Sequence, residues 1–164
     1  MSELDQNSDG VLSELELRKS PGLMASIPLF DLDGDGALTA AELEGRLEQW
    51  RGEKTGLLPY RCEVRWKGKP LSGATVHLHA EPFFNGAIAD ATGVSDFAGS
   101  VDLSCRPEDL PEALKNVRAI RPGVYRIEVT HPAVNLPAKY NTHTTLGQSV
   151  SLRNSATLTL ELTP

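Results

Sequence analysis

The sequence has no long apolar run, no basic patch and few aromatic residues. No stretch approaches the roughly 18 to 20 apolar residues that cross a bilayer, so no membrane span is expected. No signal peptide begins at Met1. Because no basic patch with interleaved aromatic side chains is present, nothing suggests nucleic acid as a partner. Aromatic residues make up only 5% of the 164 residues, yet 40% are hydrophobic, which suffices for a packed core.

Sequence motifs of common enzymes are also missing, and only two cysteines are present. There is no G-x-S-x-G motif, which argues against a serine hydrolase. Cys62 and Cys105 lie in no C-x-x-C motif and beside no histidine, so a catalytic thiol is not expected. The pair predicts one disulfide across a separation of 43 residues, which would stabilise the fold by roughly 2–4 kcal/mol. The alternative is two buried free thiols.

Negative charge is concentrated in the first third of the chain. Residues 1–58 carry 12 acidic and 5 basic side chains, a net charge of −7, whereas residues 59–164 carry 10 acidic and 11 basic ones. Residues 50–60 end a helical pattern and introduce glycine and proline before a different texture begins. We therefore expect two domains, residues 1–56 and residues 57–164.

The stretch DLDGDGALTAAE, residues 31–42, has the spacing of a twelve-residue calcium loop and is called loop 2. Ca²⁺ takes about six to eight oxygen ligands. A loop can supply them if every second residue faces inward and the chain turns sharply in the middle. Gly36, at the sixth position, permits the positive φ of that turn. Leu38, at the eighth, is expected to face the core. The expected ligands are the side chains of Asp31, Asp33, Asp35 and Glu42, the backbone carbonyl of Ala37, and a water held by Thr39.

The same pattern begins 26 residues earlier, in DQNSDGVLSELE at residues 5–16, which is called loop 1. Gly10 and Leu12 take the places of Gly36 and Leu38. Loop 1 offers three carboxylates and loop 2 offers four, so loop 1 is predicted to be the weaker site. Two complete, aligned loops favour calcium binding over acidic, solvated turns. The expected ligands in loop 1 are the side chains of Asp5, Asn7, Asp9, Ser13 and Glu16 and the carbonyl of Val11.

This repeated acidic loop with a closing glutamate resembles the EF-hand family. The resemblance implies a pair of EF-hands, two bound Ca²⁺ ions, and a short antiparallel bridge through Leu12 and Leu38. Only 14 residues, two of them proline, separate the loops, so short helices are expected and a large calcium-driven opening is disfavoured. The pattern reaches the first residues of the chain, which fits either a longer parent sequence or a short entering turn.

From residue 59 onward the apolar residues alternate with a period of two, which is typical of strands. Runs such as YRCEVRW, ATVHLHA, GVYRIEVT and ATLTLEL are separated by glycine, proline and asparagine. About seven strands are expected, in an antiparallel β-sandwich. Residues 106–117 interrupt them with a pattern that predicts one or two helical turns.

Four segments in succession, GKPLSGATVHLHAEP, ADATGVSDFAGSVDL, RPGVYRIEVTHP and LPAKYNTHTTLGQSVSL, carry a second resemblance. They are similar to the transthyretin-like, carboxypeptidase-regulatory-like sandwich modules of exported bacterial proteins, especially those of planctomycetes. The resemblance implies an extracytoplasmic or secreted accessory module, and it supplies no catalytic residue. The expected fold is of the α+β class: a small helical EF-hand pair followed by a seven-stranded antiparallel transthyretin-like or Ig-like β-sandwich.

The function expected from these features is that of a non-enzymatic calcium-binding protein. Its sandwich would provide recognition or spacing, with a protein or carbohydrate partner that the sequence does not identify. One alternative is a dockerin-like docking module, although dockerin loops usually close with aspartate rather than with Glu16 and Glu42. The other alternative is a metalloenzyme that uses His77 and His79, which share one face of a strand. Exposed or edge-strand histidines without a metal are the simpler interpretation.

Overall fold

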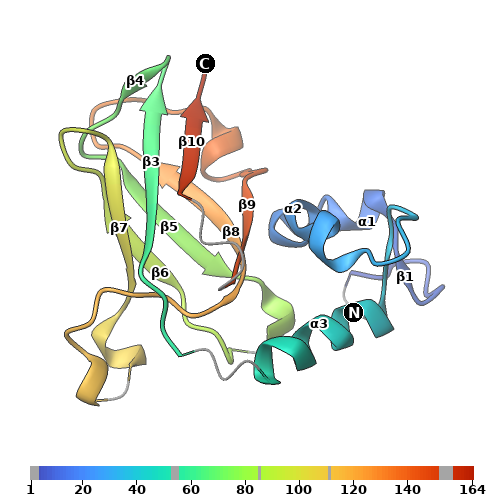
Figure 1. The fold of residues 1–164 in the computed structure, drawn as a ribbon. Coiled ribbons are helices and arrows are strands. Elements are labelled where there is room, and N and C mark those ends of the chain that lie inside the picture. The colour runs from blue at the N-terminus through green and yellow to red at the C-terminus, as the bar shows by residue number, and fades with distance from the viewer. Residues whose placement is uncertain (1–3, 53–55, 85, 111, 152–156) are drawn as a thin grey trace.

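The protein consists of a small helical unit packed beside a curled β-sheet (Figure 1). A computed structural model describes residues 4–52, 56–84, 86–110, 112–151 and 157–164. The presence of both a helical unit and a sheet confirms the predicted α+β class. The predicted domain boundary near residue 56 adjoins residues 53–55, outside the described residues, and stays a prediction.

The helical unit contains two short strands and three helices: β1 (Val11–Leu12), α1 (Glu14–Leu17), α2 (Pro21–Phe30), β2 (Leu38–Thr39) and α3 (Ala40–Gly52). Strands β1 and β2 pair antiparallel, with Leu12 opposite Leu38, as the loop pattern predicts. Both leucines are fully buried and pack with Leu17, Leu23 and Phe30. Pro21 begins α2, where its missing N–H and fixed φ are tolerated. The helices between the loops are short, as expected.

The sheet contains eight strands: β3 (Tyr60–Trp66), β4 (Lys69–Pro70), β5 (Thr75–Ala80), β6 (Ala91–Val94), β7 (Ser100–Cys105), β8 (Gly123–Thr130), β9 (Gly147–Val150) and β10 (Leu158–Leu162). Their order is β10-β3-β7-β6-β5-β8-β9, with β4 pairing β3. One pair departs from the antiparallel prediction, because β10 runs parallel to β3, with Leu160 opposite Val64. The turns predicted within residues 106–117 form as η2 (Pro107–Asp109) and η3 (Glu112–Leu114).

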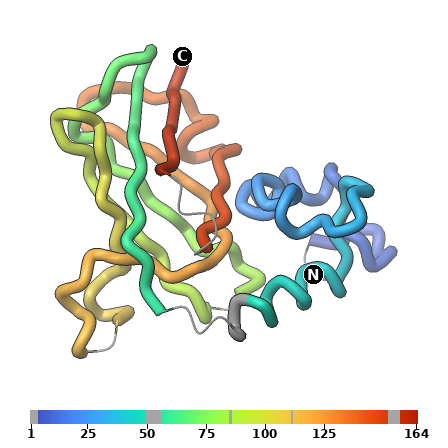
Figure 2. Tube along the Cα trace, viewed as in Figure 1, coloured from blue at the N-terminus to red at the C-terminus, as the bar shows by residue number. Residues whose placement is uncertain are grey.

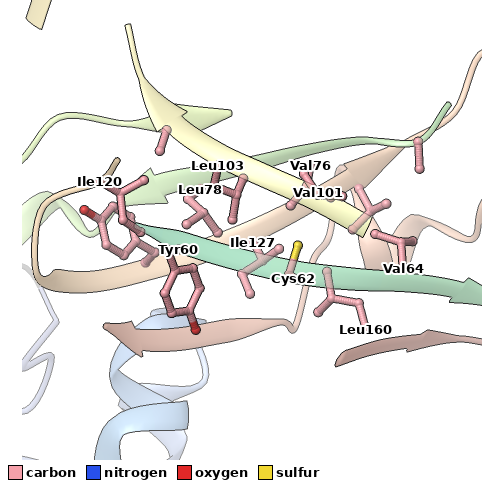
Figure 3. Close-up of a cluster of buried hydrophobic side chains, with 14 of the residues drawn as sticks. Tyr60, Cys62, Val64, Val76, Leu78, Val101, Leu103, Ile120, Ile127 and Leu160 are labelled. Atoms are coloured by element: carbon pink, nitrogen blue, oxygen red, sulfur yellow. The ribbon is translucent and has the colours of Figure 1, made fainter. Parts of the chain in front are cut away.

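Alternating side chains of the strands fill one core, because the sheet curls around them (Figure 3). In β3 the residues Tyr60, Cys62 and Val64 are buried, while Arg61 between them is exposed. They meet apolar side chains from the neighbouring strands and from across the curl. Each large aliphatic side chain buried in this way contributes roughly 1.5–3 kcal/mol of transfer free energy. This core holds the sheet together.

The two cysteines are free and buried, so the predicted disulfide is wrong. Cys62 lies opposite Val101 in the β3–β7 pair, and Cys105 is four residues further along β7. At about 3.3 Å per residue, that spacing separates the two positions by roughly 13 Å, well beyond the reach of a disulfide. Burial raises the pKa of the Cys62 thiol to about 12, which keeps it protonated.

The helical unit is attached to the sheet through α2, which packs against β8 and β9. In Figure 2 the blue N-terminal trace lies beside the orange-red β9. A Cβ added to Gly147 of β9 would overlap the carbonyl oxygen of Pro21, so the two backbones touch directly. The Gly22 N–H donates to the buried Glu81 Oε1 at 2.7 Å. Val124 of β8 belongs to the core of the helical unit.

Candidate metal centre

Loop 2 is folded by hydrogen bonds from its own backbone to its own carboxylates. Asp31 accepts the N–H of Gly34 at Oδ1 and the N–H of Gly36 at Oδ2, at 2.6 and 2.9 Å. Asp33 Oδ1 accepts the Asp35 N–H at 3.2 Å. These turns require positive φ at the two glycines, 77° and 82°, which only glycine adopts without strain. The loop therefore turns back on itself and gathers its acidic side chains.

The gathered carboxylates form a compact cluster. One oxygen each of Asp31, Asp33 and Asp35 lies within 4.8 Å of the other two, and the last two residues are exposed. Three like charges at this spacing repel each other, and a cation bound among them would offset the repulsion. Consistent with this, the pKa of Asp33 is raised overall: the Asp35 N–H lowers it, but desolvation and the carboxylates of Asp35 and Glu42 outweigh that bond. The cluster fits a hard divalent cation.

Glu42 closes loop 2 from the first turn of α3. Its Oε2 accepts the N–H and the hydroxyl of Thr39, at 2.9 and 2.8 Å, while its Oε1 accepts the Leu32 N–H at 2.9 Å. The Glu42 N–H returns a bond to the Thr39 hydroxyl, which completes a capping box. The N–H groups of Thr39 and Leu32 hold the pKa of Glu42 below its usual value. The carboxylate is thus kept charged and pointed across the loop.

Loop 1 repeats most of these bonds, except that no bond from the backbone of Ser8 to Asp5 is found among the described residues where Gly34 bonds Asp31 in loop 2. The Gly10 N–H donates to Asp5 Oδ2 at 3.0 Å, and the Val11 N–H donates to Asp9 Oδ1 at 2.9 Å. Positive φ occurs at the fourth and sixth positions, as in loop 2, but here the fourth residue is Ser8, with φ of 58°. Asn7 replaces an aspartate and donates its amide to Asp9 Oδ2 at 2.8 Å. Loop 1 has the same turns with one charge fewer.

Glu16 closes loop 1 as Glu42 closes loop 2. Its Oε2 accepts the N–H and hydroxyl of Ser13, at 2.9 and 2.7 Å, and its Oε1 accepts the Gln6 N–H at 2.8 Å. The Ser13 hydroxyl and N–H, followed by the Gln6 N–H, lower the pKa of Glu16 to about 2. Glu16 is 6% exposed and Glu42 9%. Both closing carboxylates are therefore buried and ionised.

An orphaned oxygen in loop 1 points to a ligand there. Asp5 Oδ1 is buried and has no hydrogen-bond partner among the residues that the structure describes, although Oδ2 of the same carboxylate is bonded to Gly10. A buried carboxylate oxygen without a donor is costly, and a bound cation would satisfy it. The first position of the loop is where the sequence predicts a calcium ligand. The residues present therefore fit Ca²⁺ in both loops.

The structure brings some of the predicted ligands together, while the role of others stays a prediction. It brings the three loop 2 aspartates together, and the turns put Asp5, Asn7 and Asp9 in equivalent places. The hydroxyls of Ser13 and Thr39 donate to the closing glutamates of their own loops, and the predicted roles of Ser13 as a ligand and of Thr39 in holding a water stay predictions. Ligation by the carbonyls of Val11 and Ala37 stays a prediction.

Sequence reasoning missed two features of the site. The first is the positive φ at the fourth loop position, although Gly34 offered a signal for it in the sequence. The second is the bond from the backbone of Gln6 and of Leu32 to the closing glutamate. Backbone donors leave no side-chain signature, so no residue type could have revealed this second feature.

Comparison with known proteins agrees with this geometry over a short stretch. The family model described as EF hand matches residues 29–45, which span loop 2 with the end of α2 and the start of α3. Together with the acidic cluster, the match indicates that the chain contains a calcium-binding EF-hand. None of the curated proteins and none of the solved structures matches the chain. Among the described residues, no helix is long and apolar enough to cross a membrane.

Proposed function

We propose that the protein is a non-enzymatic calcium-binding protein that holds two Ca²⁺ ions in paired EF-hand loops. The observation that carries the proposal is the convergence of Asp31, Asp33 and Asp35 in a loop whose turns recur in loop 1. The antiparallel bridge between Leu12 and Leu38 ties the loops into one unit. Occupancy of one loop would then support the geometry of the other.

The calcium ions would stabilise the folded protein by linkage. Ions that bind the folded loops better than the unfolded chain raise the free energy of unfolding by about 2.7 kcal/mol per site at a free concentration of 100 times Kd. Because α2 connects the two loops and packs on the sheet, this stabilisation would extend to residues 57–164, called the β-domain. We infer that the β-domain is a transthyretin-like sandwich of an extracytoplasmic protein and provides a surface for recognition or spacing. Its turn and strand pattern supports this inference.

Loop 1 is expected to be the weaker site for two physical reasons. Asn7 replaces a carboxylate, so loop 1 attracts the ion with three charges rather than four. Ser8 holds a positive φ that costs a residue with a Cβ about 1 kcal/mol. Both effects act on the folded, metal-binding form of the loop.

A calorimetric titration with Ca²⁺ tests the proposal. The chelator-stripped protein, in millimolar Mg²⁺, is expected to show two binding events, one weaker than the other. Glu16→Gln should remove the weaker event and Glu42→Gln the tighter one, because each substitution deletes the closing charge of one loop. Glu112→Gln, at an exposed side chain far from both loops, serves as the charge-matched control.

The outcomes separate the parts of the proposal. A single event that E42Q abolishes and E16Q leaves intact would contradict the second site. No binding, with an independent assay such as equilibrium dialysis agreeing, would contradict calcium binding altogether. A Kd near 0.1–1 mM would support a structural, extracellular role, whereas micromolar or tighter binding would point to a sensor or buffer.

A further inference from the structure

A second cluster of metal-ligating side chains lies on the sheet, outside the calcium loops. His77 and His79 are on one face of β5, and Glu128 of the adjacent strand β8 stands opposite His77 in the strand register. The two imidazole rings stack, with centroids 5.9 Å apart and planes 15° from parallel. Asp90, just before β6, reaches the same place. The calcium-binding proposal assigns none of these residues a role.

His79 is held in one orientation by Asp90. The Ala80 N–H donates to Asp90 Oδ1 at 2.9 Å, which fixes the carboxylate. Asp90 Oδ2 then lies 3.1 Å from His79 Nδ1, so a proton on Nδ1 is favoured and the lone pair is left on Nε2. A carboxylate behind the histidine is the arrangement that orients metal-binding imidazoles and makes them more basic.

His79 Nε2 is left without a hydrogen bond in a contact that suits a shared cation. The atom is buried and has no hydrogen-bond partner within the described part of the chain. Yet Glu128 Oε2 is only 3.3 Å away. Two ligands of one ion at bond lengths of about 2.0–2.2 Å, spread tetrahedrally, lie about 3.3–3.6 Å apart and off each other's bond axis. The contact between His79 Nε2 and Glu128 Oε2 has this separation and does not form a hydrogen bond.

We propose that His79 Nε2 and Glu128 Oε2 bind a divalent transition metal of the zinc or nickel class, with His77 as a third ligand. Imidazole prefers such metals over Ca²⁺, so this site would not compete with the acidic loops for their ion. Arg126 lies 3.6 Å from Glu128 Oε1, which leaves Oε2 to face His79. Among the described residues only the loop 2 aspartates have three ligand atoms within 4.8 Å of one another, so the site requires the His77 ring to rotate towards His79 and Glu128 when the metal binds.

Zinc titration of the calcium-saturated, untagged protein tests the site. Excess Ca²⁺ keeps the acidic loops occupied, and ZnCl₂ alone is the probe. We expect one Zn²⁺ per chain, with the affinity reduced more than tenfold in His79→Gln and in Glu128→Gln. His77→Gln should weaken binding less. Asp90→Asn should cost about 10–100-fold, as is usual for a carboxylate behind a metal-binding histidine.

His143→Gln is the matched control, because His143 is exposed and lies outside the cluster. It should bind Zn²⁺ like the unaltered chain, and circular dichroism should show every variant folded. Zinc binding that persists unchanged in H79Q would overturn the proposal. So would the absence of binding, together with ring ¹⁵N shifts showing His79 protonated on both nitrogens. In that case His79 is an imidazolium between two carboxylates and needs no metal.

Discussion

At the scale of single residues, the fourth position of each loop separates two sites that otherwise share their turns. Gly34 and Ser8 both have positive φ, 77° and 58°. The conformation is free for glycine and strained for serine, because a Cβ approaches the following carbonyl oxygen. No neighbouring atom lies within 4 Å of a Cβ added at Gly34, so backbone strain is the only cost of a side chain there.

Exchanging the two residue types should therefore have opposite effects. We expect Ser8→Gly to raise the free energy of unfolding by roughly 0.5–1 kcal/mol and Gly34→Ser to lower it by a similar amount. Urea unfolding in excess Ca²⁺ measures both. The same sign of change in the two variants would contradict the strain argument.

A second residue-scale prediction concerns the buried carboxyl of Glu81. Burial raises its pKa above 4.5, and the Gly22 N–H only partly offsets this. The folded protein then holds a proton at pH values where the unfolded chain has released it. Stability contributed by Glu81 is therefore gained as the pH falls through the folded pKa towards 4.5, and it is lost above that pKa.

Comparison with Glu81→Gln isolates this effect, since glutamine still accepts the Gly22 N–H but does not titrate. Unfolding free energies measured from pH 7.5 to 4.5 should show the unaltered protein gaining stability relative to E81Q as the pH falls. An exposed control, E112Q, should give no such trend. If the unaltered protein instead lost stability relative to E81Q as the pH fell, the pKa of Glu81 would be lowered rather than raised.

At the scale of elements, the contact of α2 with β9 depends on glycine. The backbones of Pro21 and Gly147 meet so closely that a single added carbon overlaps a carbonyl oxygen. Gly45 in α3 is a contrasting position, because a Cβ there meets nothing within 4 Å. The two glycines should respond to alanine in opposite ways.

Gly147→Ala is expected to destabilise the protein by about 1–3 kcal/mol, the usual cost of overpacking. Gly45→Ala should stabilise it by up to about 1 kcal/mol through helix propensity. Thermal unfolding of both variants in excess Ca²⁺ checks the pair. A neutral G147A would show that α2 does not dock on β9 as closely as described.

The sequence predicted those elements that depend on local patterns. The ligand spacing of each loop and the alternation of each strand are encoded over a dozen residues or fewer, and the Leu12–Leu38 bridge follows from two such loops that start 26 residues apart. The parallel pairing of β10 with β3 joins residues nearly a hundred positions apart, and nothing local records it. The disulfide failed for a related reason, because strand register, not sequence separation, sets the distance between Cys62 and Cys105.

The docking of the helical unit was also beyond the sequence. Gly147 and Glu81 look like an ordinary turn glycine and a surface acid until α2 is placed against them. Loop ligands carry their own geometry, whereas an interface requires both of its surfaces to be known. The candidate calcium site was therefore far more predictable than its connection to the sheet.

At the scale of the whole molecule, the two acidic loops and the sheet are linked through α2. The helix begins after loop 1, ends at loop 2 and packs on β8 and β9. Removing the ions would leave the acidic loops repelling themselves at both ends of this helix. The effect should therefore reach strands that bind no metal.

Amide hydrogen exchange measures how far into the sheet the loss of Ca²⁺ lowers the local stability. We expect chelation of Ca²⁺ to speed amide exchange in β8 and β9 several-fold, and to change β3 and β7 less, since these strands lie further along the sheet order. In the G147A variant, the response of β9 should shrink, because α2 is already displaced. Exchange that changes in the loops alone would show that the two units are energetically independent.

The position of β9 gives the helical unit one more consequence. This strand ends the sheet order, so its outer edge pairs with no further strand in the described part of the chain. An open edge is a template for adding strands from other molecules, and proteins commonly hide such edges under a helix or loop. Here the helix packed against β9 is α2. Removing the metal would then empty the loops and also expose the unpaired backbone N–H and C=O groups of β9. Bound calcium would in this way keep neighbouring chains from aggregating edge to edge.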